Sequence, residues 1–253
     1  MRVEAAIPPL RAAIIAQVLG TLTAVGLIAL IYPRLFQMPL AVAGIQSLCA
    51  AFTSHKLEAP PWWLAIHLVF MPLVVLASGL GLHPGWYLAI FILLLLVFWR
   101  TDLSRVPLYM SNQQTAMAVA DLLPTRPCQA VDLGCGNGAL LRTLARLRPD
   151  CRFIGVEHAP LPWLWARLGC LGQANCRIRY GDFWRQPLHD FALVYAFLSP
   201  VPMPRLWAKA RAEMAAGSLL VSNSFAVPDT PAEKTVQVAD RRATRLFCYR
   251  PGA

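Results

Sequence analysis

Apolar positions run almost without interruption through the first hundred residues, and charged positions return abruptly after them. The stretches 12–32 and 37–54 contain no charged residue. The run 59–99 contains none either, and His83-Pro84-Gly85 supplies a turn near its middle. A helix needs about 20 apolar residues to cross roughly 30 Å of hydrocarbon. The pattern predicts four membrane-spanning helices, near residues 12–32, 37–54, 62–82 and 84–99.

From about residue 130, short apolar runs alternate with amphipathic segments. Predicted strands lie at 130–133, 152–156, 176–180, 191–197, 218–222, 235–239 and 244–249. Predicted helices lie between them at 139–148, 162–172 and 203–216. This alternation is typical of a parallel sheet with helices on both faces, and the last two strands read as an antiparallel hairpin. We expect an α/β domain with a Rossmann-like seven-strand sheet, residues 100–253, after an all-α membrane region, residues 1–99.

Composition sharpens this division. Charged residues make up 14% of the chain, against about 25% in an ordinary soluble domain. Residues 1–99 hold 6 of them and residues 100–253 hold 30, so the low average belongs to the first part. Seven cysteines without a CxxC pair indicate reduced thiols rather than a disulfide framework or a metal site. Without a run rich in lysine and arginine, no nucleic-acid partner is expected.

Basic residues in short loops predict how the helices are oriented. The loops on one side of the four expected spans carry Arg2, Arg11, Lys56, Arg100 and Arg105. The loops on the other side carry only Arg34. We therefore expect a lipid bilayer as partner and both termini, with the second domain, on the cytosolic side, as in a bacterial inner-membrane protein.

A glycine-rich loop follows the first predicted strand. Asp132 stands two residues before Gly134, and Gly136 and Gly138 follow, with Cys135 inside the loop. Glycine allows a tight turn and a close approach of the backbone to a ligand. In sheets of this kind, ligands bind at the carboxyl ends of the strands. The loop therefore predicts a nucleoside-binding site.

An acidic residue ends the second predicted strand. Glu157 lies 23 residues beyond Gly134, and its carboxylate can accept hydrogen bonds from both hydroxyls of a ribose. His158 follows it and is expected to edge the cofactor site. Two nucleoside cofactors compete at this stage, because a dinucleotide site would show GxGxxG, with a glycine near the pyrophosphate.

The spacing Asp132-x-Gly134-x-Gly136-x-Gly138 resembles motif I of class I S-adenosylmethionine (SAM) methyltransferases. A carboxylate beside the loop suits SAM, which presents an ammonium and a sulfonium instead of a diphosphate. Gly181-Asp182-Phe183 resembles the adenine-contacting motif of the same superfamily. There Asp182 would accept a hydrogen bond from the adenine amino group, and Phe183 would pack on the ring. The resemblance implies S-adenosyl-L-methionine as the cofactor and a methyltransferase sheet.

Segments 106–111, 195–200 and 217–225 extend the resemblance. Together with 131–138 they look like the small membrane-anchored lysine methyltransferases of the adenine nucleotide translocase and ATP synthase c-subunit type. That family typically has one hydrophobic anchor segment, and its segment before the first helix has proline where this chain has Met110. The resemblance covers roughly residues 103–250. It implies methyl transfer to a lysine side-chain amine of a membrane protein.

Methyl transfer from a sulfonium requires positioning more than a dedicated nucleophile. A lysine acceptor must be neutral, and an apolar, aromatic pocket disfavours its charged form. Topology suggests Tyr109, Tyr195 and Ser199 for the acceptor pocket, although Tyr195 could equally pack in the core. Two other functions stay open: methylation of a small apolar acceptor such as a lipid or quinone, and a membrane scaffold that binds SAM without turnover.

Overall fold

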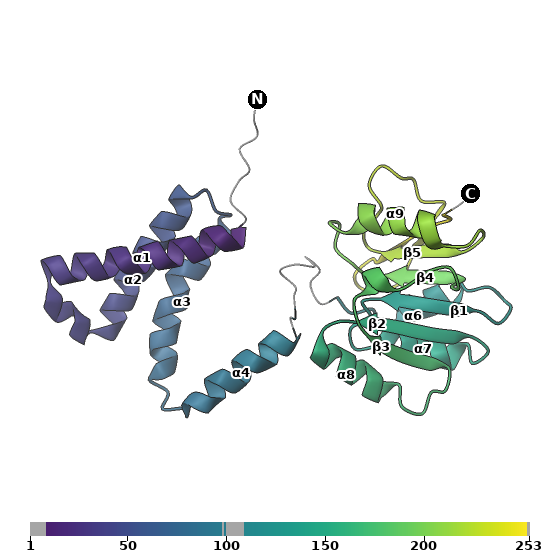
Figure 1. Ribbon diagram of the computed structural model, residues 1–253, viewed down its shortest axis with the longest axis horizontal. Helices are drawn as coiled ribbons and strands as arrows, with labels where there is room; N and C mark the ends of the chain where they lie inside the picture. The colour runs from purple at the N-terminus through teal and green to yellow at the C-terminus, as the bar shows by residue number, and fades with distance from the viewer. Residues whose placement is uncertain (1–8, 98, 100–108, 252–253) are drawn as a thin grey trace. The chain divides into compact units, whose positions relative to one another are not determined.

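The structure is a computed structural model that describes residues 9–97, 99 and 109–251. The chain packs as two compact units, residues 1–87 and 88–253 (Figure 1). The N-terminal helices are α1 (Pro9–Ile31), α2 (Pro39–Lys56), α3 (Trp62–Ser78) and α4 (Pro84–Val97), with the short 3-10 helix η1 (Pro33–Gln37) after α1. Proline starts α2 and α4, where its missing N–H costs no helical hydrogen bond.

Four helices form where four were predicted, but they do not qualify equally as membrane spans. Among the described helices, only α1 is long and apolar enough to cross a membrane, by length and composition. Helices α3 and α4 have 17 and 14 residues, fewer than the roughly 20 that a span requires. Polar side chains interrupt α2. The expectation of spans at 12–32, 37–54, 62–82 and 84–99 is corrected to one candidate span. The orientation argument depended on four, so it no longer places both termini in the cytosol.

Small residues bring α1 and α2 into close contact. A Cβ atom on Gly20 would lie 2.5 Å from the Cα of Ala50, so the two helices leave no room for a side chain there. Polar groups meet inside: Gln46 donates to the hydroxyl of Thr21 at 3.1 Å. The large apolar side chains of α1 point outward instead, with Leu30 exposed to 85%. This arrangement of small and polar residues inside and apolar residues outside reverses the usual pattern of a soluble bundle.

The second unit contains a seven-strand sheet in the order β3-β2-β1-β4-β5-β7-β6. Strands β1 to β5 are parallel, and β7 is antiparallel to both β5 and β6. The strand bounds are β1 Gln129–Leu133, β2 Arg152–Glu157, β3 Cys176–Tyr180, β4 Leu193–Ala196, β5 Leu219–Asn223, β6 Lys234–Gln237 and β7 Arg245–Tyr249. The predicted α/β sheet with a C-terminal antiparallel hairpin is confirmed.

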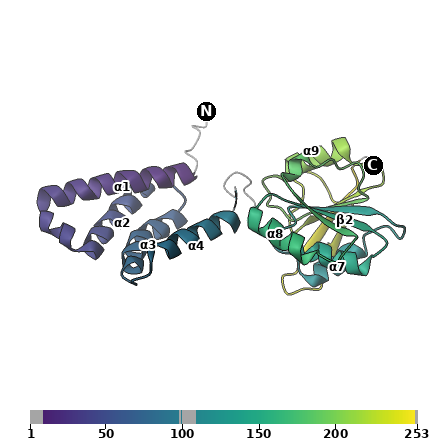
Figure 2. The same ribbon diagram turned by 60° about the horizontal axis from the view of Figure 1, so that its bottom comes forward.

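Helices cover both faces of this sheet. Their bounds are α6 Gln113–Ala120, α7 Ala139–Leu147, α8 Pro160–Gly169 and α9 Met203–Glu213, with a short 3-10 helix η2 at Phe183–Arg185. One buried cluster joins α6, α7 and α8 to the sheet, and a second cluster joins α9 to the opposite face. Figure 2 shows α7 and α9 on opposite sides of the strands. Strand β1 lies between β2 and β4, where the strand order reverses, so the loops after these strands converge at one edge.

Candidate active site

The glycine-rich loop adopts a backbone that favours glycine at three positions. Gly134, Gly136 and Gly138 have φ angles of 81°, 53° and 70°, in the left-handed region where other residues are strained. Gly138 also caps α7, and a Cβ there would lie 3.1 Å from the Cβ of Ala166 on α8. The loop therefore turns tightly into α7, and its last glycine packs against the middle of α8.

The Glu157 carboxylate holds the loops after β1 and β2 together. It is buried, and its Oε2 accepts a hydrogen bond from the backbone N–H of Gly136 at 2.9 Å. Its Oε1 accepts from the backbone N–H groups of His158 and Ala159, at 2.9 and 2.8 Å. Each carboxylate oxygen has two acceptor sites, so Oε2 keeps one free for a hydroxyl donor. The ring of His158 lies beside this carboxylate, with its Nδ1 3.5 Å from Glu157 Oε1 and its Nε2 3.0 Å from the carbonyl oxygen of Trp99.

Asp132 places a second carboxylate near the first, at the next to last position of β1. Burial and the charge of Glu157 raise its pKa to about 8. Among the described residues, no hydrogen-bond donor reaches its side chain. A buried carboxyl group without a partner costs free energy that a nearby cation would offset. Asp132 is thus the strongest sign of a cationic ligand in the described part of the chain.

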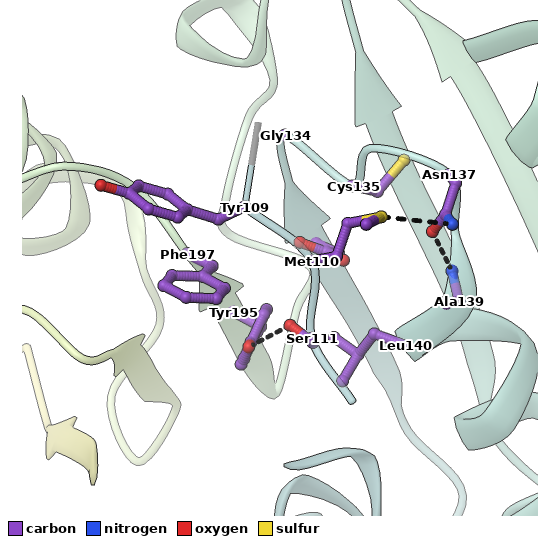
Figure 3. A pocket seen from close by; sticks show the side chains of 11 residues that line it. Tyr109, Met110, Ser111, Gly134, Cys135, Asn137, Ala139, Leu140, Tyr195 and Phe197 are labelled. Carbon is purple, nitrogen blue, oxygen red and sulfur yellow. Dashed lines mark hydrogen bonds between the residues drawn. The ribbon is translucent and has the colours of Figure 1, made fainter. Parts of the chain in front are cut away.

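A pocket opens beside Asp132 at the carboxyl edge of the sheet (Figure 3). Residues 109–112, which we call the cover segment, lie across it. The Tyr109 ring stacks on Phe197, with centroids 4.7 Å apart, and the Ser111 hydroxyl hydrogen-bonds to that of Tyr195 at 2.7 Å. The full lining is Tyr109, Met110, Ser111, Asp132, Gly134, Cys135, Asn137, Ala139, Leu140, Tyr195 and Phe197. The pocket therefore combines an acidic floor with aromatic and sulfur-containing cover.

Comparison with known proteins identifies what this arrangement is similar to. Residues 132–234 match the family model described as the ANTKMT methyltransferase domain. The mouse adenine nucleotide translocase lysine N-methyltransferase is 32% identical over 183 residues, which are 68% of this chain and 73% of that protein.

The chain belongs to this methyltransferase family.

Two further similarities are narrower. The release factor glutamine methyltransferase of Escherichia coli is 50% identical over 38 residues, or 15% of this chain and 14% of that enzyme. A crystal structure of an RNA methyltransferase from Salinibacter ruber with S-adenosyl-L-homocysteine aligns with a TM-score of 0.49 at 21% identity, covering 58% of this chain and 94% of that one. The predicted family resemblance is confirmed: the protein is a SAM-dependent methyltransferase, and its cofactor is S-adenosylmethionine.

The chemical groups around the glycine loop of this methyltransferase suit that cofactor. SAM carries an ammonium and a sulfonium, and the buried, unpaired carboxyl group of Asp132 offers the opposite charge. The positive φ angles of the loop expose backbone without side chains in front of it. We expect Asp132 to face the cationic end of SAM and Glu157 to face the ribose. When bound, SAM supplies a methyl group already activated by its positive sulfur.

Of the three residues predicted for the acceptor, two reach the methyltransferase pocket. Tyr109 and Tyr195 line it, whereas Ser199 does not. The Ser199 hydroxyl is buried, and within the described residues it has no hydrogen-bond partner. The Tyr195 hydroxyl also accepts from the Asn223 side chain at 2.7 Å. Burial and the nearby Asp132 raise the pKa of Tyr195 above its usual value, so this hydroxyl stays protonated and cannot act as a base near neutral pH.

Three predicted cofactor residues have mainly structural contacts in the methyltransferase. Asp182 accepts from the backbone N–H of Trp184 at 3.0 Å and so caps η2, while its side chain remains exposed. Phe183 is buried in the cluster under α9, with its ring 4.8 Å from that of Trp184. Cys135 lines the pocket, and burial raises the pKa of its thiol, which keeps it neutral. The assignment of Asp182 and Phe183 to adenine stays a prediction.

One polar contact over the pocket was missed by sequence reasoning. Asn112 donates to Asp240 Oδ2 at 2.6 Å, so the cover segment is fastened to the turn between β6 and β7. The same carboxylate accepts from the backbone N–H and the hydroxyl of Thr244, and these bonds lower the pKa of Asp240 to about 2. In addition, Arg242 donates to the carbonyl oxygen of Met110 at 3.4 Å. The C-terminal hairpin therefore helps to hold the cover of the methyltransferase pocket.

We expect Asn112→Asp to weaken SAM binding about tenfold. The variant places a second carboxylate against that of Asp240 in place of the hydrogen bond from Asn112 to Asp240, and this repulsion loosens the cover segment. Aspartate is as good a helix N-cap as asparagine, so the cap that Asn112 provides for α6 is kept. Titration calorimetry of the full chain would measure the change. The double variant Asn112→Asp/Asp240→Asn restores a donor and an acceptor in exchanged positions, and it should recover most of the affinity. Equal affinity in the wild type and in Asn112→Asp would show that the contact does not hold the cover.

Proposed function

We propose that this methyltransferase transfers a methyl group from SAM to the ε-amine of a lysine on a membrane protein. The observation that supports it most directly is the similarity to the mouse adenine nucleotide translocase lysine N-methyltransferase, which extends over 73% of that protein. The pocket adds chemical support. Its aromatic pair, Tyr109 on Phe197, offers an apolar surface for the methylene chain of a lysine.

The pocket must also favour the neutral amine, because a protonated lysine has no lone pair with which to attack the methyl carbon of SAM. Lysine starts near pKa 10.4, and enclosure by Tyr109, Met110 and Phe197 lowers that value by desolvation. The ammonium proton leaves to water before transfer. A nitrogen–carbon bond then forms as the carbon–sulfur bond breaks. The chain itself binds, orients and excludes water, which is where the rate gain of this reaction comes from.

Membrane attachment is part of the proposal. Helix α1 is long and apolar enough to cross a bilayer, and its large side chains are exposed while small residues meet α2. We propose that the catalytic unit faces the cytosol of a bacterial cell. All seven cysteines are free thiols, which suits a reducing compartment. The anchor would raise the effective concentration of membrane-bound acceptors.

Methyl-labelled SAM tests the proposal in membranes that contain the full-length protein. We expect label in methyl-lysine after protein hydrolysis. Label in the organic extract instead would identify a small apolar acceptor, which Met110 and Leu140 in the pocket wall could also accommodate. Bound SAM without any transferred label would indicate a scaffold. Membranes with the Glu157→Ala variant, which should bind SAM much more weakly, provide the background at a low SAM concentration.

A further inference from the structure

Helix α8 carries an apolar face that nothing in the described structure covers. Its buried side is formed by Pro162 and Ala166. The opposite side exposes leucine and tryptophan over two turns and the residues after them: Leu164 to 43%, Trp165 to 63%, Leu168 to 57% and Leu171 to 70%. A soluble helix normally presents charged or polar residues on its outer side. Contiguous exposed apolar surface of this kind marks a docking face.

The charges around this face restrict what can cover it. Residues 158–181 contain no acidic residue, but they contain Arg167, Arg177 and Arg179. Arg167 lies on α8 itself, with its guanidinium 5.4 Å from the ring centre of Trp163. Arg177 and Arg179 alternate along the edge strand β3 with Ile178, which packs on the α8 side, so they project from the opposite face of the sheet. A helix with exposed leucine and tryptophan, an arginine of its own and no acidic residue in the surrounding segment has the composition of one that lies in the headgroup region of an anionic bilayer.

The position of α8 connects this face to the active site. The helix starts at Pro160, three residues after Glu157. The Glu157 carboxylate accepts a hydrogen bond from the backbone N–H of Ala159, the residue just before the helix. The N-terminal end of α8 therefore lies at the carboxyl edge of the sheet, where the pocket opens. Eleven residues, 98–108, separate the end of α4 from the cover segment, and a chain of that length reaches at most about 40 Å.

We propose that the exposed face of α8, formed by Leu164, Trp165, Leu168 and Leu171, lies in the headgroup region of an anionic lipid bilayer. The inference rests on the proposed membrane location. Docking there lays α8 and the strands antiparallel to it along the bilayer surface, with the carboxyl edge of the sheet and the mouth of the pocket beside the membrane. It gives the enzyme a second membrane contact besides its N-terminal helices, and this contact selects acceptor amines close to the membrane surface.

Photo-crosslinking tests the contact in the full-length protein, reconstituted in phosphatidylcholine vesicles with and without phosphatidylglycerol. The variants Trp165→benzoylphenylalanine and Leu168→benzoylphenylalanine place a photoreactive group on the face. The matched control is Leu147→benzoylphenylalanine, a comparably exposed leucine at the end of α7. We expect lipid adducts at positions 165 and 168 but not at 147. Phosphatidylglycerol should increase them about fivefold, and Arg167→Gln should remove that increase.

Adducts with a second copy of the chain, adducts with residues 9–97, or equal lipid adducts at all three positions would overturn the proposal. SAM binding, measured on each variant, shows that the site is still folded. Transfer of labelled methyl to lysine is followed in the same vesicles. Loss of lysine label with intact lipid adducts would refute the proposed acceptor only. Lysine label without lipid adducts at 165 and 168 would refute the α8 contact only.

Discussion

Glu157→Ala is expected to weaken SAM binding about ten- to a hundredfold, because a charge-assisted hydrogen bond from the ribose to the free acceptor site on Oε2 is worth about 1.5–3 kcal/mol. The same change should lower the free energy of unfolding by about 3 kcal/mol. It leaves three backbone N–H groups, those of Gly136, His158 and Ala159, without their acceptor. Equilibrium dialysis with labelled SAM and denaturant unfolding measure the two effects separately.

The control for this variant is Glu157→Gln. The glutamine side chain has nearly the same size as glutamate, but only one of its two terminal atoms is an acceptor oxygen. The other is an amide NH2 group, a donor, and it would face either a backbone N–H or the ribose hydroxyl where an acceptor is needed. We expect intermediate stability and binding nearly as weak as in Glu157→Ala. A folded Glu157→Ala protein with wild-type affinity for SAM would show that the ribose lies elsewhere.

The second prediction concerns the proton on Asp132. With a pKa raised to about 8, this carboxyl group is protonated in the free protein near neutral pH. The amino group of SAM, with an ordinary pKa of about 7.7–8.0, is also protonated there. A cation beside Asp132 favours the carboxylate, so SAM binding should release about one proton. Affinity should therefore rise about tenfold between about pH 6 and about pH 7, the direction required when the bound state holds fewer protons.

Calorimetry in two buffers of different ionisation enthalpy counts the released protons directly. Asp132→Asn has nearly the same shape, but it cannot ionise, and it should bind SAM without this proton release and without the rise in affinity. Proton release that persists in Asp132→Asn would assign the titration to another group. Binding by the wild type without proton release would mean that the cation of SAM does not lie at Asp132.

The strands and the glycine loop were predictable because their causes are local. Each central strand is a short apolar run between turn residues, and β1, which was predicted at 130–133, is found at Gln129–Leu133. The prediction of four membrane spans was wrong for a physical reason. A stretch without charged residues can contain turns as well as helices, so its length overestimates the length of the helix. Gly79 and Gly81 end α3 well before residue 82, and the charge pattern could not register them.

The contact between Asn112 and Asp240, which the sequence did not predict, has no signature in the sequence near either residue. Asn112 and Asp240 are 128 positions apart, and each has an ordinary explanation by itself, as a helix cap and as a turn residue. Only the pairing of β7 with β5 brings the hairpin turn near the cover segment. Likewise, the alternation of β4 allowed Tyr195 either face, and the structure places its ring in the core with its hydroxyl at the pocket.

The cover segment contacts several parts of the catalytic unit. Tyr109 packs on Phe197 and Phe225, and its neighbours Met110, Ser111 and Asn112 hydrogen-bond to the glycine loop, to Tyr195 and to the C-terminal hairpin. These four residues therefore join parts of the catalytic unit that are far apart in the sequence. A single substitution in the cover segment can disturb the glycine loop, the core under β4 and the C-terminal hairpin at the same time.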